Sequence, residues 1–327
     1  MSKDPTHFDW LASESAPEFY PMQIISGDLR YHGDPRGAGL YVPSGGVISH
    51  GWGRGDSTHV VGPDVKPLPD RLEITFYSYL EDVFYQGSFE LPYDKILNLF
   101  QTEEAKPKKK DRNGDDIPVA YRILVGVAPG GTVAVWANAR GNQELFFGQA
   151  KQVELDFAKA FRMPPFANQA KRTEYINKMI DYEIPAAMLA DLRKNGIAFE
   201  QWAQYRTQYH WRPVFTVSHP PAEFGIGFYN GESGRYYLPY DEFTTTTHPV
   251  PKGINFSYAV NGQGIEYLYI ITFDKAEMLE TFARLGANHQ PLQLEFDPKV
   301  PIELTQIRLR NEKEAITLKK FAIKEIK

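Results

Sequence analysis

The chain of 327 residues contains no cysteine. Disulfide bonds, cysteine-ligated zinc sites and thiol nucleophiles are therefore excluded. No run reaches the roughly 18 to 20 apolar residues that span a bilayer. The N-terminus, "MSKDPTHFDW", lacks the apolar core of a secretory signal. We expect no membrane span, and a cytoplasmic location for the chain as written, or a periplasmic one if a leader has been removed.

The common catalytic and cofactor motifs are also missing. The sequence contains no GxxxxGK[ST] phosphate loop, no GxSxG nucleophile elbow and no HExxH zinc motif. Histidines and carboxylates gather around His32, Asp34, His50 and His59, but without the spacing of a metal site. We therefore expect no catalytic residues, no metal site and no cofactor.

Charge and aromatic content narrow the class of protein further. With 36 Lys and Arg against 41 Asp and Glu, the net charge of −5 argues against a general nucleic-acid-binding protein, which usually carries a basic domain. Aromatic residues make up 14% of the chain, including 19 Tyr and 21 Phe, and such residues suit pleated, half-buried surfaces. The composition therefore favours a β-rich fold.

The pattern along the chain divides it into three parts. Residues 1–154 and 210–327 alternate short strand-like segments with Gly- and Pro-rich turns, whereas residues 155–209 have helical composition. We predict an α+β, β-rich fold in which two mainly antiparallel β domains are joined by a helical connector. In the N-terminal part, residues 1–66 are expected to hold only short strands, at Met22–Ile25 and Leu40–Val42, within long loops.

Local signals predict several individual elements. The segment "RLEITFYSYL" alternates with a period of two, which indicates a strand with two distinct faces: Leu72, Ile74 and Phe76 against Glu73, Thr75 and Tyr77. The segment "DKAEMLETFARLG" predicts a helix that Asp274 caps at its start, with Glu277 three residues later, and that Gly286 ends.

The stretch "ILVGVAPGGTVAVWANARG", residues 123–141, has two interpretations. Glycines between apolar runs can form a loop that binds phosphate, or a turn between two strands. No lysine follows Gly130 and Gly131, and the next residues are β-branched and aromatic rather than helix-forming. A hairpin with its turn at Pro129-Gly130-Gly131 is the better interpretation.

A repeated tetrapeptide raises the question of an internal duplication. Leu-Pro-Tyr-Asp occurs at Leu91–Asp94 and again at Leu238–Asp241, each time after an aromatic, strand-like segment. The repeat can mark a duplicated β unit, or it can be a coincidence of four residues. Both interpretations stay open at the level of sequence.

Two regions supply candidate binding residues. The loop "GWGRGDSTHVVG" concentrates polar groups on a flexible backbone, and "FYSYLEDVFYQGSF" places aromatics on both faces of its strands. Tyrosine and tryptophan contribute contact energy at interfaces, although the same pattern also suits a core buried on both sides. The candidates are Trp52, Arg54, Asp56, His59, Tyr77, Tyr79 and Tyr85.

Four segments together resemble the bacterial domain-of-unknown-function 2931 family: "FDWLASESAPEFYPMQIISGDLR", "GWGRGDSTHVVG", "LPDRLEITFYSYLEDVFYQGSFELPYDKI" and "ILVGVAPGGTVAVW". Their order and spacing fit over about residues 8–155, and "KNGIAFEQWAQYRTQYHWRPVF" is similar to a further region of longer members. Many members look like periplasmic lipoproteins with a lipidated cysteine, which this chain lacks. Some look like immunity partners of antibacterial effectors of contact-dependent systems such as type VI secretion. The resemblance carries no catalytic residues.

We therefore expect a non-enzymatic binding protein, with a cognate effector toxin as its partner and steric occlusion as its mechanism. Two alternatives remain. A hydrolase-type enzyme would gather polar groups around Asp56 and His59 in a deep pocket, and a carbohydrate- or lipid-binding module would show a flat aromatic platform or an apolar cavity. The oligomeric state does not follow from the sequence.

Overall fold

The computed structural model describes residues 4–108, 110, 113–117, 119–217, 219–259, 266–299 and 302–326. The chain divides into two compact units, Met1–Phe199 and Glu200–Lys327. The predicted helical segment 155–209 thus contributes most of its helices to the N-terminal unit and one short helix to the C-terminal unit. Within the described residues, no helix is both long enough and apolar enough to cross a membrane.

The described part of the N-terminal unit contains the strands β1 (His7–Ser15), β2 (Met22–Tyr31), β3 (Gly39–Tyr41), β4 (Val65–Pro67), β5 (Pro69–Ser78), β6 (Val83–Glu90), β7 (Tyr121–Ala128), β8 (Thr132–Asn138), β9 (Asn142–Gln149) and β10 (Lys151–Val153). Its α-helices are α1 (Tyr93–Ala105), α2 (Phe157–Ala160), α3 (Gln169–Glu183) and α4 (Ala186–Asn195), and its 3₁₀ turns are η1 (Pro129–Gly131) and η2 (Pro164–Ala167).

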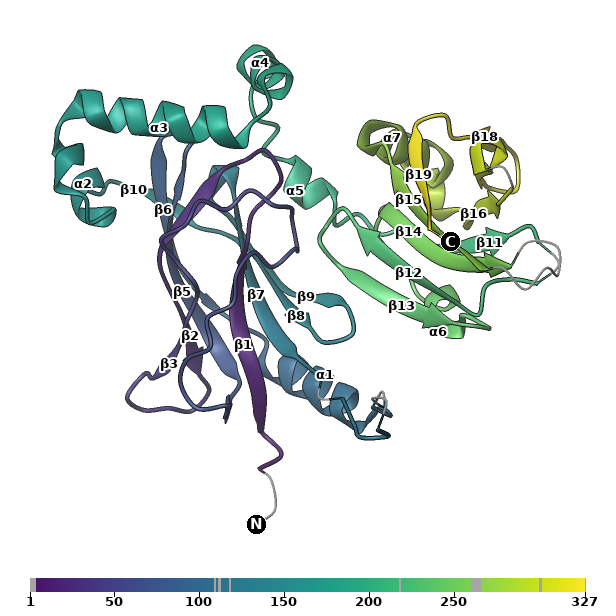
Figure 1. Ribbon diagram of the computed structural model, residues 1–327, viewed down its shortest axis with the longest axis horizontal. Coiled ribbons are helices and arrows are strands. Elements are labelled where there is room, and N and C mark those ends of the chain that lie inside the picture. The colour runs from purple at the N-terminus through teal and green to yellow at the C-terminus, as the bar shows by residue number, and fades with distance from the viewer. Residues whose placement is uncertain are drawn as a thin grey trace. The chain divides into compact units, whose positions relative to one another are not determined.

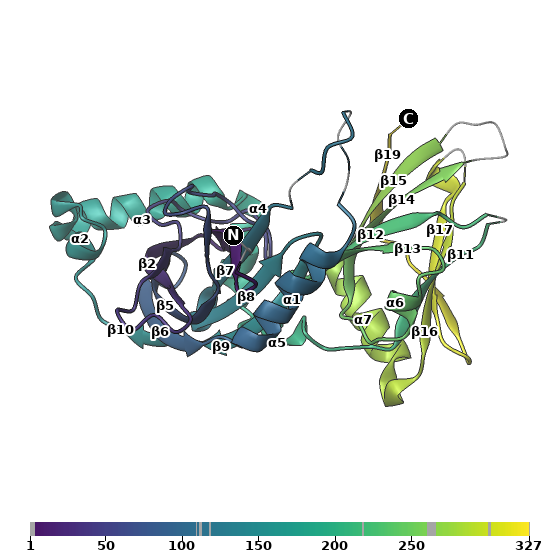
Figure 2. The same cartoon turned by 90° about the horizontal axis from the view of Figure 1, so that it is seen from below.

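These strands form two five-stranded sheets, in the orders β4-β1-β7-β8-β9 and β10-β6-β5-β2-β3 (Figure 1). Apolar side chains of both sheets meet in one core, among them Trp10, Ile74, Phe76, Val125 and Val135, all nearly inaccessible to solvent. Helix α1 packs at one end of this sandwich through Ile96 and Phe100 (Figure 2). The sandwich arises because the inward-facing side chains of both sheets are apolar and pack against one another.

In the C-terminal unit the described residues form the strands β11 (Trp211–Phe215), β12 (Glu223–Phe228), β13 (Ser233–Tyr237), β14 (Pro251–Ala259), β15 (Glu266–Phe273), β16 (Leu292–Asp297), β17 (Gln306–Arg310), β18 (Ala315–Thr317) and β19 (Phe321–Ile326). Its helices are α5 (Gln201–Gln204), α6 (Asp241–Thr244) and α7 (Lys275–Leu285), with 3₁₀ turns η3 (Ala287–His289) and η4 (Ile302–Leu304). The sheet orders are β11-β16-β17-β18 and β13-β12-β14-β15-β19.

The fold class predicted from sequence is confirmed. The structure is β-rich, and its four sheets are mostly antiparallel and belong to two separate groups. Among the described strands, only β1 with β7 and β11 with β16 pair in parallel. Helix α7 has the predicted cap, because the Asp274 side chain accepts a hydrogen bond from the Glu277 N–H at 2.9 Å.

The two strands expected in residues 1–66 are present as β2 and β3, but the expectation omits strand β1. This strand runs through His7–Ser15 and pairs in parallel with β7, more than a hundred residues further along the chain. Its sequence, "HFDWLASES", is buried along both faces toward its end, so it shows little of the alternation that marks a half-buried strand. The partner that makes it a strand is distant in sequence, and local patterns do not reveal it.

The predicted hairpin is confirmed. Strands β7 and β8 pair in antiparallel register from Arg122 with Asn138 to Ala128 with Thr132, and the turn between them is Pro129–Gly131. Gly130 has a φ of 75°, in the left-handed region that favours glycine.

The two Leu-Pro-Tyr-Asp segments differ in structure. Tyr93 of the first copy is already helical, at the start of the long helix α1, whereas Tyr240 of the second copy has a φ of 68° ahead of the short helix α6. The next strand after the first copy, β7, joins the opposite sheet, whereas the next strand after the second, β14, pairs with β12 in the same sheet. The two identical tetrapeptides therefore have different backbone conformations.

Candidate functional site

The outward face of β5 changes character along the strand. Arg71, Glu73 and Thr75 occupy its first half, and Tyr77 and the following Tyr79 lie at its far end. The two tyrosines pack against α2, η2 and α3, of which α2 and α3 are labelled in Figure 1. The first half of the strand has no such cover and lines an open hollow. One strand thus contributes both a hidden aromatic layer and an open polar surface.

We call the uncovered part the open polar face, and it is formed by six side chains of three adjacent strands: Ser26, Asp28, Glu73, Thr75, Gln86 and Ser88. These residues line a hollow of about 590 Å³, to which Lys151 of β10 also contributes. A volume of that size lies within the range of sites for small molecules and for the side chains of a partner. The ladder hydrogen bonds of the sheet hold the surface in place.

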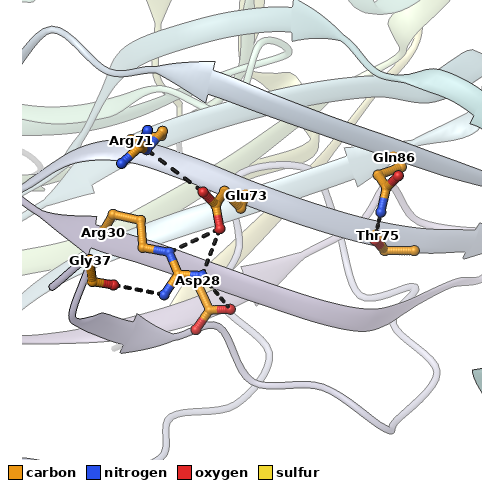
Figure 3. A network of polar contacts seen from close by, with 7 residues as sticks. All are labelled: Asp28, Arg30, Gly37, Arg71, Glu73, Thr75 and Gln86. Carbon is orange, nitrogen blue, oxygen red and sulfur yellow. Dashed lines mark hydrogen bonds and ion pairs between the residues drawn. The ribbon is translucent and has the colours of Figure 1, made fainter.

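Two carboxylates face each other across this surface. Asp28 of β2 is the direct cross-strand partner of Glu73 of β5, a placement in which like charges repel. Arg30 compensates: its Nε and Nη2 donate to Glu73 Oε2 at 2.9 and 2.6 Å, and its Nη1 donates to the Gly37 carbonyl at 2.9 Å (Figure 3). The hydrogen bond to Glu73 raises the pKa of the Arg30 guanidinium above its ordinary value.

The other polar side chains of the face form weaker or fewer contacts than Arg30 and Glu73 do. The Asp28 carboxylate lies 3.7 Å from Arg30 Nη2, too long for a hydrogen bond, and Arg71 Nε lies 3.7 Å from Glu73 (Figure 3). Gln86 Nε2 donates to Thr75 Oγ1 at 3.1 Å, and no described residue donates a hydrogen bond to the amide oxygen of Gln86. The face can therefore accept and donate further hydrogen bonds without breaking its internal ones.

The structure places the predicted aromatic residues inside the N-terminal unit. Tyr77 is fully buried and its hydroxyl donates to Asp82, which also pairs with Arg172 of α3. Tyr79 is 1% exposed and donates to Gln23 Oε1 at 2.6 Å. Because α2 and α3 cover this half of the sheet, these rings form a second core rather than a contact surface.

Tyr85, the third predicted tyrosine, is buried in the sandwich core. Its hydroxyl donates to Glu81 Oε1 at 2.8 Å. The aromatic residues of this region therefore pack on both sides of one sheet. This is the second of the two interpretations given above, a core buried on both sides.

The polar loop does not gather its candidates into one pocket. The Asp56 carboxylate contacts Nδ1 of His50, whereas His59 Nδ1 lies 2.9 Å from the Tyr41 hydroxyl. Trp52 packs edge-on against the buried Trp136, with ring centroids 4.9 Å apart. Arg54 is exposed. Asp56 and His59 therefore do not form a catalytic pair, and Trp52 serves to anchor the loop on the outer face of β7 and β8.

Sequence reasoning missed Asp28, Arg30 and Gln86 as candidates. The signal that could have found part of the face was present, because the period-two pattern of β5 already set Glu73 and Thr75 on the side opposite the core. Their neighbours come from β2 and β6, and only the register of the sheet shows that these residues share a surface. Across the described ranges, no group of three or more His, Asp or Glu side chains is placed to hold a metal ion.

Comparison with known proteins gives one match. A family model described as "Protein of unknown function (DUF2931)" matches residues 1–197. This range ends two residues before the boundary of the N-terminal unit at Phe199, so the open polar face lies inside it and the C-terminal unit lies outside. No curated protein and no solved structure matches the chain.

Proposed function

The chain belongs to the DUF2931 family, and on that premise we propose that it is a non-enzymatic binding protein whose N-terminal unit holds a protein partner on the open polar face. The observation that carries the proposal is the contrast within one sheet. Helices bury the aromatic half of the outer face, and the adjoining half is left as a hollow with charged and amide groups.

The physical character of the face suits recognition. Strand pairing fixes its side chains, and Arg30 holds Glu73 in one orientation through two hydrogen bonds. Binding to such a surface loses little conformational entropy, because the groups are ordered before the partner arrives. Polar and charged groups in a fixed pattern also discriminate between partners, since a mismatched charge remains desolvated and unpaired.

The specific form of the proposal is an immunity protein that occludes a secreted antibacterial effector. The resemblance of the N-terminal segments to a family in which some members look like effector immunity partners supports this form. Occlusion requires only a stable complex and no chemistry, in keeping with a sequence that lacks the common catalytic motifs. In this view the effector presents donors to Asp28 and to the Gln86 amide oxygen.

The test is co-expression with the product of the neighbouring gene. We expect the wild-type chain to bind that protein in a pull-down and to restore growth if the protein is toxic. Gln86→Arg changes the charge and size of the face without replacing a neighbour of the Arg30–Glu73 pair, whereas Asp28→Lys also replaces the carboxylate that lies 3.7 Å from Arg30 Nη2. Each variant should abolish both effects.

The matched control is Glu174→Lys, which reverses one exposed charge on α3, the helix that covers the other half of the sheet. It should bind and protect as the wild type does. Thermal unfolding of all variants checks that they are folded. A toxic neighbour that is neither bound nor suppressed overturns immunity, and equal binding by all variants overturns the assignment of the face.

A second candidate function is binding of an oligosaccharide, favoured by the hydrogen-bonding groups that line the hollow. Phe89 also lines it, but its ring is tilted by 42° to that of Phe146, so these two rings do not form a flat platform. Titration with a set of neutral oligosaccharides, read as a shift in melting temperature, separates the two functions. A shift that Gln86→Arg removes supports sugar binding over a protein partner.

A further inference from the structure

The C-terminal unit carries a row of long polar side chains on one face of the sheet β11-β16-β17-β18. Arg212 of β11 is in register with Gln293 of β16, and Gln293 is in register with Arg310 of β17. The neighbouring positions Trp211, Leu292 and Leu309 are buried in the unit, so the row points away from the core. Two strand spacings separate the two arginines, about 10 Å between their Cα atoms.

The row has an excess of positive charge. Arg308 and Arg310 share one carboxylate, Glu295, whose side chain is only 12% exposed. Their shortest distances to its oxygens are 3.3 and 3.4 Å, long for charge-assisted hydrogen bonds. Among the described residues, Arg212 forms no ion pair at all. Three arginines against two glutamates, Glu295 and the neighbouring Glu312, leave an excess of one positive charge at this face.

A hollow of about 320 Å³ lies at the end of the row. His210, Arg212, Gln293, Arg310 and Asn311 line it. Each of these side chains can donate a hydrogen bond, and the two guanidinium groups offer several donors each in a planar fork. Glu312 also borders the hollow and supplies its one carboxylate.

We propose that this hollow binds a compact oxyanion, the phosphate group of a soluble small molecule. Arg212 and Arg310 approach the anion from two sides of Gln293, whose amide lies between them. Arg310 has five N–H donors and gives only one weak contact to Glu295, so most of its donors are available to a ligand. The planar forks match the oxygens of a phosphate group, which accept paired hydrogen bonds. Because the family match ends at residue 197, this site is independent of the function proposed for the N-terminal unit.

The test is calorimetric titration of the full chain with inorganic phosphate, against sodium chloride at the same ionic strength. We expect saturable binding of one phosphate per chain. Arg212→Ala and Arg310→Ala should each weaken it at least about tenfold, since each removes hydrogen bonds to a charged group. Arg212→Lys keeps the charge but loses the fork, and should also weaken binding.

The control is Arg308→Ala, which removes the same charge from the same face but does not border the hollow. Its affinity should stay within about twofold of the wild type, because a charge that does not touch the ligand is screened by solvent ions. Absence of saturable binding overturns the proposal. Equal weakening by Arg308→Ala and Arg212→Ala also overturns it, since the effect is then one of general positive charge.

Discussion

The carboxylate of Glu81 accepts the backbone N–H of Gly130 through both oxygens, at 3.1 and 3.0 Å. Gly130 lies at the tip of the β7–β8 hairpin, and Glu81 lies in the turn between β5 and β6, in the opposite sheet. The glycine turn that resembles a phosphate-binding loop in sequence therefore does bind an anion, and that anion is a side chain of the same chain. The contact ties the two sheets of the sandwich together at this end.

Replacement of Glu81 by alanine should lower the free energy of unfolding by about 1–3 kcal/mol. The change leaves two donors without their acceptor, the Gly130 N–H and the hydroxyl of the buried Tyr85. Urea denaturation measures the loss. Glu90→Ala, at an exposed position of β6, is the control and should change stability by no more than about 0.5 kcal/mol. Equal stability of both variants contradicts the role given to Glu81.

Gly130→Ala should destabilise the chain more than Gly62→Ala. Both glycines have a φ near 70°, at 75° and 72°, so alanine is strained at each by roughly 1–2 kcal/mol. At Gly130 a Cβ atom would also lie 2.8 Å from Cδ1 of Phe199, whereas at Gly62 nothing lies within 4 Å. Because the backbone strain is similar at both positions, the difference in thermal stability between the two variants reports the contact with Phe199. A larger loss of stability in Gly62→Ala contradicts this prediction.

Tyr79→Phe should cost about 1–2 kcal/mol, because it removes the donor to the buried Gln23 oxygen. Tyr182→Phe, on α3 with 82% of its residue exposed, should have no measurable effect on the free energy of unfolding.

Burial also raises the pKa of the Tyr79 phenol. The unfolded tyrosine ionises near pH 10 and the folded one keeps its proton, so the contribution of this group to stability falls as pH rises above about 10. Denaturation of the wild type and of Tyr79→Phe at several pH values above about 10 measures this effect, because the free energy of unfolding should fall more steeply with pH in the wild type.

Arg30 and Glu73 should show strongly non-additive effects. Arg30→Ala leaves Glu73 opposite Asp28 with its main cation gone, and should cost up to about 1 kcal/mol at this partly exposed position. If Glu73→Gln is already present, the same change should cost less, because the repulsion between the two carboxylates has been removed. A double-mutant cycle by urea denaturation gives the coupling. Additive effects rule out compensation by Arg30.

The stability of the C-terminal unit should fall as pH drops below about 6.5, through His248. Burial lowers the pKa of this imidazole, whose Nε2 lies 2.9 Å from the Phe243 carbonyl and whose ring stacks on that of Phe243. Below its ordinary pKa the unfolded state binds a proton that the folded state resists, so stability decreases until the folded pKa is passed. His248→Phe should reduce the difference in unfolding free energy between pH about 7.5 and about 5.5. If the variant and the wild type lose the same unfolding free energy between the two pH values, the pH dependence comes from groups other than His248.

The sequence predicts those structural features that depend on residues close together in the chain. The alternation of "RLEITF" sets Glu73 and Thr75 on one side of β5, Asp274 caps α7, and Pro129-Gly130-Gly131 turns between two strands. Each of these features depends on backbone geometry within a few residues, where sequence patterns act directly. The same reasoning missed β1, because its parallel partner β7 lies in a distant part of the chain.

The sequence by itself determined which side chains of a strand share a face, since the direction of the side chain alternates with every residue. Only the tertiary structure decided what covers each face. Helices α2 and α3 bury Tyr77 and Tyr79 but leave Glu73 partly exposed, and register with β2 brings Asp28 beside Glu73. Burial depends on contacts between segments far apart in the chain, so the same outward alternation became a second core at one end of β5 and a polar surface at the other.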